Sequence, residues 1–256
     1  MAKIFLTFVI FFGSYLSADE LMAAVKSEYR DPENIIRDEF RNPYETLTFF
    51  GIEPSMKVVE LSPGGGWYTE ILATYLNNSG ELIAAHFDEN SNNNYLKKIR
   101  KNFEKKMDSN SIYEGVKIVD LTSGLTEPRS ADAVLTFRNL HNWLGSTMDT
   151  IFANSFKALK SGGIFGVVEH RAEVGTSIQN MKKSGYVTEE HAIEVAKKHG
   201  FVLVSKSEIN SNPKDLKNYE KGVWTLPPSL RLKEKNKGKY LAIGESDRMT
   251  LLFKKP

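Results

Sequence analysis

The sequence has no cysteine. This absence excludes disulfide bonds, thiolate metal ligands, a cysteine nucleophile and the lipid-modified cysteine of a lipoprotein anchor. The sequence also has no large excess of positive or negative charge. It has 34 Lys and Arg and 32 Asp and Glu, which gives a net charge of +2. The lysines are spread over several segments without interleaved aromatic residues. Composition therefore gives no reason to expect a nucleic-acid partner.

Long apolar runs are scarce as well, and the clearest one lies at the amino terminus. Residues 4–12 are almost all apolar and follow Lys3, and residues 14–18 are rich in small side chains before Asp19. This order is typical of a secretory signal peptide over residues 1–18, and the run is short for a membrane span. We therefore expect an exported protein, periplasmic or secreted, with no stable membrane span after cleavage. An uncleaved anchor and a buried first helix are the alternatives.

A glycine-rich turn joins a predicted strand to a predicted helix. Residues 56–61 are a short apolar run, as in a buried parallel strand, and from Thr69 apolar residues recur at helical spacing. Three consecutive glycines at the junction, Gly64, Gly65 and Gly66, allow positive φ and remove the Cβ atoms that would keep a ligand from the main chain. The first N–H groups of the helix face the same gap. Such a turn accepts a nucleotide-like ligand or an anion.

The acidic residue of this region precedes the glycines. In dinucleotide-binding enzymes an acidic residue follows the glycines by about 20 residues. Here Glu60 comes before them, at the end of the predicted strand. A carboxylate in this place favours a ligand with a positively charged group and would repel a pyrophosphate. A nicotinamide-dependent oxidoreductase is therefore the weaker alternative.

Residues 59–66 resemble the first motif of the class I (Rossmann-like) S-adenosylmethionine (SAM)-dependent methyltransferases, usually written E/D-x-G-x-G-x-G. Ser62 stands where that motif has its first glycine. The order leucine, lysine, any residue, glycine, glycine and apolar strand over residues 159–168 is a second similarity. The resemblance extends to a group of predicted bacterial methyltransferases with signal peptides, through residues 64–70, 169–171, 222–228 and 244–249.

The apolar pattern predicts one α/β domain over residues 19–256, which is long enough for a substantial core. The resemblance implies a Rossmann-like, seven-stranded and mostly parallel sheet, with an antiparallel last strand and helices on both faces. Leader helices are expected over residues 19–54, and an ordered insertion over residues 210–247 between the last two strands. The predicted strands lie at residues 56–61, 81–87, 116–121, 131–137, 164–168, 201–207 and 248–254.

The leader should form at least two helices before the first strand. Apolar spacing predicts a helix over residues 19–30, with Tyr29 on its packing face. A second helix should begin after Asp31 as its cap, and its apolar side should include Ile35 and Ile36.

The resemblance implies a SAM site that includes Glu60, Ser62 and the three glycines. In the family, a carboxylate at the tip of the second strand accepts hydrogen bonds from both ribose hydroxyls. That position falls on His86, but a carboxylate can accept two hydroxyl protons and a neutral imidazole only one. We therefore predict Asp88 in this role, with His86 as the alternative. Asp120, at the end of the third strand, would lie near the adenine amino group or cap its own loop.

Polar residues follow the fourth and fifth predicted strands, at the edge where open α/β sheets bind ligands. Methyl transfer needs a positioned acceptor, and a base if the acceptor carries a proton. His141 and His170 are the candidate bases, because imidazole titrates near neutrality, and Glu169 would orient one of them. Structural hydrogen bonds are the alternative for all three. No His-x-x-x-His or Glu-x-x-His spacing supports a metal site, and no metal is expected.

The candidate substrate residues are two arginines and two neighbours of the site. Arg138 and Arg171 could bind an acidic substrate through paired donors. Asn139 follows the fourth strand, and Trp224 lies in the expected insertion. The predicted function is SAM-dependent methyl transfer to a small molecule. Because SAM is made in the cytoplasm, an exported protein that keeps the fold and binds a ligand or partner without catalysis is the alternative.

Overall fold

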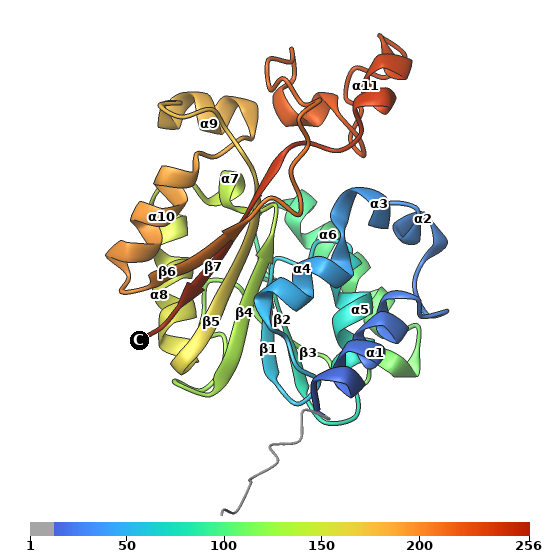
Figure 1. Cartoon of the computed structure of the whole chain (residues 1–256), viewed down its shortest axis with the longest axis vertical. Helices are drawn as coiled ribbons and strands as arrows, with labels where there is room; N and C mark the ends of the chain where they lie inside the picture. The colour runs from blue at the N-terminus through green and yellow to red at the C-terminus, as the bar shows by residue number, and fades with distance from the viewer. Residues whose placement is uncertain (1–12) are drawn as a thin grey trace, which may run out of the picture.

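A seven-stranded sheet is the central layer of this computed structural model, which describes residues 13–256 (Figure 1). The strands are β1 (Lys57–Leu61), β2 (Glu81–His86), β3 (Lys117–Asp120), β4 (Ala131–Phe137), β5 (Leu159–His170), β6 (Val202–Ser207) and β7 (Arg248–Lys254). Their order in the sheet is β3-β2-β1-β4-β5-β7-β6. Only the two pairs that β7 makes, with β5 and β6, are antiparallel. The predicted Rossmann-like fold is confirmed.

Helices cover both faces of this sheet. They are α1 (Gly13–Val25), α2 (Pro32–Ile35), α3 (Asp38–Arg41), α4 (Pro43–Phe50), α5 (Trp67–Leu76), α6 (Asn94–Met107), α7 (Leu140–Trp143), α8 (Ser146–Ala158), α9 (Ile178–Ser184), α10 (Glu189–Lys198) and α11 (Lys237–Ile243). One apolar cluster joins the sheet to α1, α4, α5 and α6, and a second joins it to α7, α8 and α10. No helix in residues 13–256 is long and apolar enough to cross a membrane.

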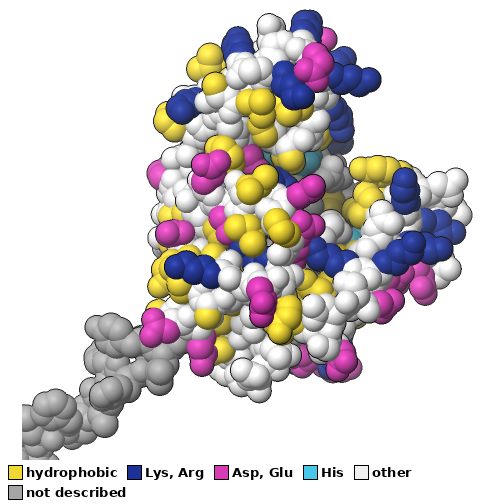
Figure 2. Space-filling view, turned by 90° about the vertical axis from the view of Figure 1, so that its right-hand side faces the viewer, with side chains coloured by type: hydrophobic (Ala, Val, Ile, Leu, Met, Phe, Trp, Pro, Cys, Tyr) yellow, Lys and Arg dark blue, Asp and Glu magenta, His cyan; other side chains and the backbone are white. Residues whose placement is uncertain are grey.

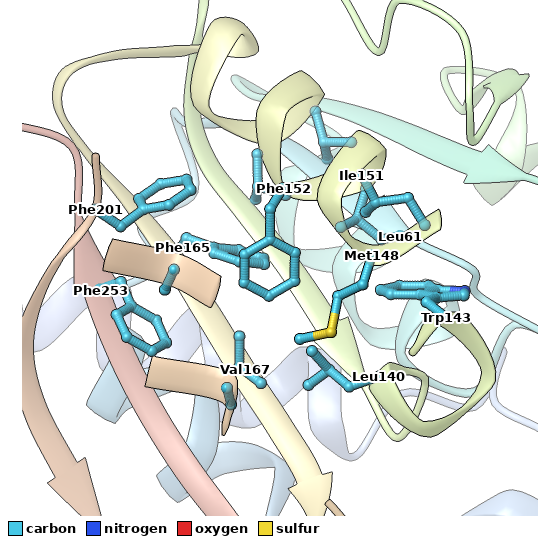
Figure 3. Packing of buried hydrophobic residues seen from close by; sticks show 14 of the residues in the cluster. Leu61, Leu140, Trp143, Met148, Ile151, Phe152, Phe165, Val167, Phe201 and Phe253 are labelled. Carbon is cyan, nitrogen blue, oxygen red and sulfur yellow. The ribbon is translucent and has the colours of Figure 1, made fainter. Parts of the chain in front are cut away.

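The apolar runs in the sequence become strands that are buried on both faces. In β1, Val58 packs in the cluster with α5, and Val59 and Leu61 pack in the cluster with α8. Figure 3 shows Phe152 of α8 against Phe165 of β5 in this second cluster, and their ring centroids lie 5.0 Å apart. A parallel strand buried on both faces reads as a continuous apolar run, which is why these strands were predictable.

The leader differs from its prediction. Helix α1 ends at Val25 instead of residue 30, and Tyr29 is 49% exposed. Asp31 caps α2 as predicted, by accepting from the N–H of Glu33, but α2 is only four residues long. Ile36 is 70% exposed and Ile35 39%, so the predicted apolar side is wrong. Ion pairs hold the chain around α2 and α3, where Arg30 pairs with Asp38 and Glu70, and Arg37 pairs with Glu245.

The segment between β6 and β7 lies over the carboxyl ends of the parallel strands. It contains a short 3-10 helix, Gly222–Thr225, and α11. Figure 1 shows α9 and α11 at the end of the molecule opposite the carboxyl terminus, above the sheet. Of the predicted signal peptide, residues 1–12 lie outside the described residues, and α1 begins at Gly13.

Candidate active site

The strand order reverses between β1 and β4, which are neighbours in the sheet. From β1 the chain moves to β2 and β3 on one side, and β4 and β5 then extend the sheet on the other. Open α/β sheets bind ligands in the crevice outside the carboxyl ends of strands at such a point. Figure 2 shows the surface hollowed between the upper part of the molecule and the lobe at the right, with histidine side chains visible there.

The glycine turn after β1 leaves backbone open on this edge. Gly64 and Gly66 have φ of 62° and 84°, and Ser62 also has a positive φ, 48°. A Cβ atom added to Gly64 or Gly65 would meet nothing within 4 Å, whereas at Gly66 it would lie 3.3 Å from the ring of Phe103 on α6. The first two glycines therefore face open space, and the third is covered by α6.

Several polar groups of this turn have no partner among the described residues. The hydroxyl of Ser62 is buried without a hydrogen bond. The N–H groups of Gly64 and Gly65 make none either, while that of Gly66 donates to the carbonyl of Pro63 at 2.9 Å. Buried polar groups are normally paired, so the Ser62 hydroxyl fits a ligand that supplies a partner, and the open N–H groups of Gly64 and Gly65 can donate to the oxygen or nitrogen acceptors of the same ligand, as SAM has.

Glu60, near the end of β1, is buried next to the turn. Its side chain is 2% exposed, and its Oε2 accepts a hydrogen bond from Thr69 Oγ1 at 2.6 Å. This bond ties the end of β1 to the start of α5. Burial raises the pKa of Glu60 to about 7. At this position Glu60 holds the turn in place through Thr69, and its attraction for a cationic ligand stays a prediction.

We expect Glu60→Gln to weaken the pH dependence of stability. The folded pKa of Glu60, about 7, exceeds the ordinary value of 4.5, so the folded state binds this proton more tightly. The contribution is complete below pH 4.5 and is lost as the pH rises through about 7, on the order of 3 kcal/mol in all. Urea unfolding at pH 5 and pH 8 measures it. Exposed Glu53→Gln is the control and should retain the wild-type slope; an equal slope in Glu60→Gln would contradict the assignment.

His86, at the end of β2, also positions the glycine turn. It is fully buried, its Nδ1 accepts from the N–H of Phe87 at 2.8 Å, and its Nε2 lies 3.1 Å from the carbonyl oxygen of Gly64. An N–H group can only donate, so the proton is on Nε2, which donates to Gly64. Burial lowers the pKa of His86 to about 4, which keeps the ring neutral. Both nitrogens are occupied, so Asp88 stays the predicted ribose ligand.

The two predicted carboxylates near the nucleoside lie in different surroundings. Asp88 is exposed, and one oxygen accepts from the N–H of Asn90 at 2.8 Å. Asp120 ends β3 and lies 3.5 Å from Nη1 of Arg100. The same nitrogen of Arg100 donates to the carbonyl of Phe87 at 2.9 Å, so this arginine bridges the ends of β2 and β3. The adenine contact of Asp120 stays a prediction.

Glu169 joins the two candidate bases. Its buried carboxylate accepts from the N–H of His170 at 2.7 Å and lies 3.0 Å from Nδ1 of His141. Against a carboxylate, Nδ1 of His141 carries the proton, and its Nε2 is left as the basic atom. Nδ1 of His170 is hydrogen-bonded to the hydroxyl of Ser246. Burial, His141 and Arg138 lower the pKa of His170, so it stays neutral. His141 therefore has the geometry of an oriented base.

The same three side chains offer a metal ligand set that sequence spacing did not indicate. One ligand atom from each of His141, Glu169 and His170 lies within 4.8 Å of the others. However, Glu169 already accepts from three N–H groups, two of the backbone and one of the ring. Arg138 and Arg248 are near enough to lower the pKa of His170, and their charge opposes a cation. The set is therefore better suited to proton transfer than to metal binding.

Arg171 is fully engaged by carboxylates. Its Nε and Nη2 contact Asp247 at 3.0 and 2.9 Å, its Nη1 and Nη2 contact Glu208 at 2.8 and 2.7 Å, and Nη1 also contacts Glu189 at 3.2 Å. These partners raise the pKa of Arg171, Glu208 most of all. No donor pair is left for a substrate, so we revise its expected role to that of an ion pair between β5, β6 and the segment before β7.

Asn139 ties two strand ends together, and Trp224 lies beside the candidate base. The side-chain amide of Asn139 donates to the carbonyls of Leu61 and Ser62, at 3.1 and 3.3 Å, and so fastens the end of β4 to the end of β1. The Trp224 ring lies 6.0 Å from that of His141, between centroids. It thus brings the segment over the site into contact with the candidate base.

Solved structures share this arrangement of strands. A geranyl diphosphate methyltransferase in complex with SAM matches 92% of this chain and 95% of its own, with 11% identity and a TM-score of 0.59. A SAM-dependent methyltransferase from Aquifex aeolicus matches 73% of this chain and 92% of its own, with 14% identity and a TM-score of 0.56. This is the class I methyltransferase fold.

The same fold also occurs in a protein named for a different reaction. The cyclase SpnF matches 95% of this chain and 94% of its own, with 14% identity and a TM-score of 0.61. No family model matches the sequence, and no curated protein does. At such identities the likeness establishes the fold, and the reaction has to be argued from the side chains.

A cluster around Glu245 was missed at the level of sequence. This carboxylate, just before β7, is 3% exposed and lies among four arginines from three separate parts of the chain. They are Arg37, Arg41, Arg138 and Arg248. Glu245 lies in residues 244–249, which carry part of the family resemblance, and no local spacing connects it to arginines about 200 residues earlier.

Proposed function

We propose that this protein transfers a methyl group from SAM to a small-molecule acceptor. SAM, when bound, supplies a methyl group on a positively charged sulfur. The observation that carries the proposal is the open glycine turn, with free N–H groups at Gly64 and Gly65, at the same sheet edge as the paired His141 and Glu169. The methyltransferase fold supports it.

The residues divide into those that hold the cofactor and those that shape its site. Ser62, Gly64 and Gly65 would bind it through their unpartnered groups, and Asp88 would accept the ribose hydroxyls. Glu60 and His86 act from beneath, through Thr69 and the Gly64 carbonyl. The turn is thus held rigid from one side and left open on the other, as binding with little reorganisation requires.

His141 is the proposed base. Its Nε2 would accept a proton from the acceptor as the methyl group is transferred, and Glu169, at 3.0 Å from Nδ1, would hold the ring and stabilise the imidazolium that forms. Trp224 packs against His141 and, together with the segment over the site, would help to exclude water. Asn139 holds β4 against β1, which keeps the histidine and the glycine turn in register.

Gly64→Val should abolish binding of SAM and of S-adenosylhomocysteine. Gly64 has a φ of 62°, which a β-branched residue rarely adopts, and the new side chain would occupy the open space in front of the turn. Isothermal titration of the wild-type protein should give affinities of about micromolar strength. Gly162→Val, at a similar φ of 82° but near Lys254 at the far end of β5, is the matched control and should bind normally.

Absence of binding by folded wild-type protein would contradict the proposed function. The fold would then serve an exported protein that binds another ligand or a partner without catalysis. The departures at Ser62 and His86 from the family pattern favour this second function.

We further propose that the protein is exported and cleaved after Ala18. Helix α1 spans this position, and cleavage there would keep its buried residues Leu21, Ala24 and Val25, which follow Ala18, in the mature chain. Amino-terminal sequencing of the protein recovered from its native host should begin at Asp19. Recovery of the chain with Met1 retained would disprove cleavage.

A further inference from the structure

The arginines around Glu245 carry more positive charge than that carboxylate balances. Arg37, Arg41 and Arg248 all donate hydrogen bonds to Glu245. Nη1 of Arg138 lies 3.7 Å from Oε2 of the same carboxylate. Four guanidinium groups therefore face one buried carboxylate. Like charges at such distances repel each other unless a further anion is shared between them.

Two of these guanidinium groups retain free donors within residues 13–256. Nη2 of Arg41 is buried without a hydrogen-bond partner, on a side chain that is only 3% exposed. The guanidinium of Arg138 makes the ion-pair contact with Glu245 but no hydrogen bond, and its side chain is 25% exposed. A buried donor without an acceptor costs free energy that a ligand oxygen would recover. Arg138 is thus the partly exposed residue of the two, and Arg41 the buried one.

The backbone of Arg138 points to the same conclusion. Its φ is 63°, in the left-handed region, and its N–H donates to the carbonyl of Val168 at 2.7 Å. Strained residues of this kind concentrate at functional sites, where the surrounding structure holds them. The position directly follows β4 and is three residues before His141, so a member of the arginine cluster and the candidate base come from the same strand end. Glu169 is among the charges that act on Arg138.

We propose that Arg138 and Arg41 bind an acidic group of the methyl acceptor, a carboxylate or a phosphate, and so place the acceptor beside His141. This inference rests on the proposed function and names the substrate class. A guanidinium fork matches both anions with paired hydrogen bonds. The excess positive charge would also draw small acids into the site.

Thermal unfolding with simple anions tests the site without knowledge of the acceptor. Sodium acetate and inorganic phosphate are titrated at constant ionic strength against wild type, Arg138→Gln and Arg129→Gln. Arg129 is exposed and at the opposite end of β4, so it is the matched control. At least one anion should give a saturable stabilisation of wild type and of the control. The Arg138→Gln substitution should lower the affinity for that anion by about tenfold to a hundredfold. Preference for acetate or phosphate tells the two acid groups apart.

Two results would overturn the proposal. An equal response of all three proteins would mean that the anions act through the solvent and not through Arg138. A loss of affinity of Arg138→Gln for S-adenosylhomocysteine, but not for 5′-methylthioadenosine, would mean that the arginine holds the amino-acid carboxylate of the cofactor. Failure of wild type to bind S-adenosylhomocysteine would instead refute the proposed function. The anion titration is done without cofactor, so its result does not depend on that outcome.

Discussion

Replacement of Glu245 by glutamine should lower the free energy of unfolding by about 3–5 kcal/mol. Glutamine keeps the shape of the side chain but removes the negative charge that four arginines share. Three of those guanidinium groups are tied to it by hydrogen bonds and cannot turn to water without loss of packing. The loss of stability therefore comes from repulsion between the arginine charges, which no negative charge balances in the variant.

Urea unfolding at pH 7 measures this change, and Glu208→Gln is the matched control. Glu208 also pairs with an arginine, at 2.7 Å, but its side chain is 66% exposed, so its loss should cost no more than about 1 kcal/mol. Losses of equal size in the two variants would contradict the argument from burial. Removal of one arginine in the Glu245→Gln background, as Arg37→Gln, should restore part of the stability.

The pH dependence of the free energy of unfolding, compared between wild type and Glu245→Gln, gives an independent check. Burial alone would raise the pKa of Glu245, but Arg41 and Arg138 outweigh it and hold that pKa well below its usual range. A carboxylate with a lowered folded pKa stabilises the protein above its unfolded pKa, and the contribution is lost as the pH falls. The free energy of unfolding of wild type should therefore fall as the solution becomes acidic. In Glu245→Gln this contribution is already absent at neutral pH, so its free energy of unfolding should fall less.

The core of the fold was predictable because its signals are local. The strands predicted at residues 131–137 and 248–254 are β4 and β7, with those bounds. The leader failed for the opposite reason. Arg30 bonds Asp38 through both Nη atoms, at 2.6 and 2.8 Å, and this pair holds the chain where apolar spacing predicted a continued helix. Contacts between charged side chains leave no periodic pattern in a sequence.

The site was predictable in its parts but not in its connections. His141 and Glu169 were predicted from their places at or near strand ends, since the carboxyl ends of neighbouring parallel strands meet at one edge. The arrangement around Glu245 depends on Arg41, 204 residues away in the chain. His86 was considered as a ribose ligand from its position in the sequence alone. Its hydrogen bond to the carbonyl of Gly64 and its burial became visible only in the structure. A sequence does not show which residues far apart in the chain come into contact, or which polar groups become buried.

His141→Gln should reduce the rate of methyl transfer by about 10²–10⁴-fold, the usual contribution of a positioned base. Nε2 of His141 is the basic atom that Glu169 leaves free, because the carboxylate fixes the proton on Nδ1. Glutamine retains a hydrogen-bond donor toward Glu169 but cannot accept the proton of the acceptor. Formation of S-adenosylhomocysteine, with any small acid that supports turnover, measures the loss.

His170→Gln is the comparison that separates catalysis from packing. Only the backbone N–H of His170 bonds Glu169, whereas its ring Nδ1 is bonded to Ser246, and burial with its neighbours keeps the ring neutral. We expect this variant to lose stability and retain most of its turnover per folded molecule, whereas His141→Gln should fold normally, bind S-adenosylhomocysteine as wild type does and lose turnover. Full turnover in both variants would remove histidine from the mechanism. The acceptor would then have to lose its proton to water or carry none, as a tertiary amine or a thioether does.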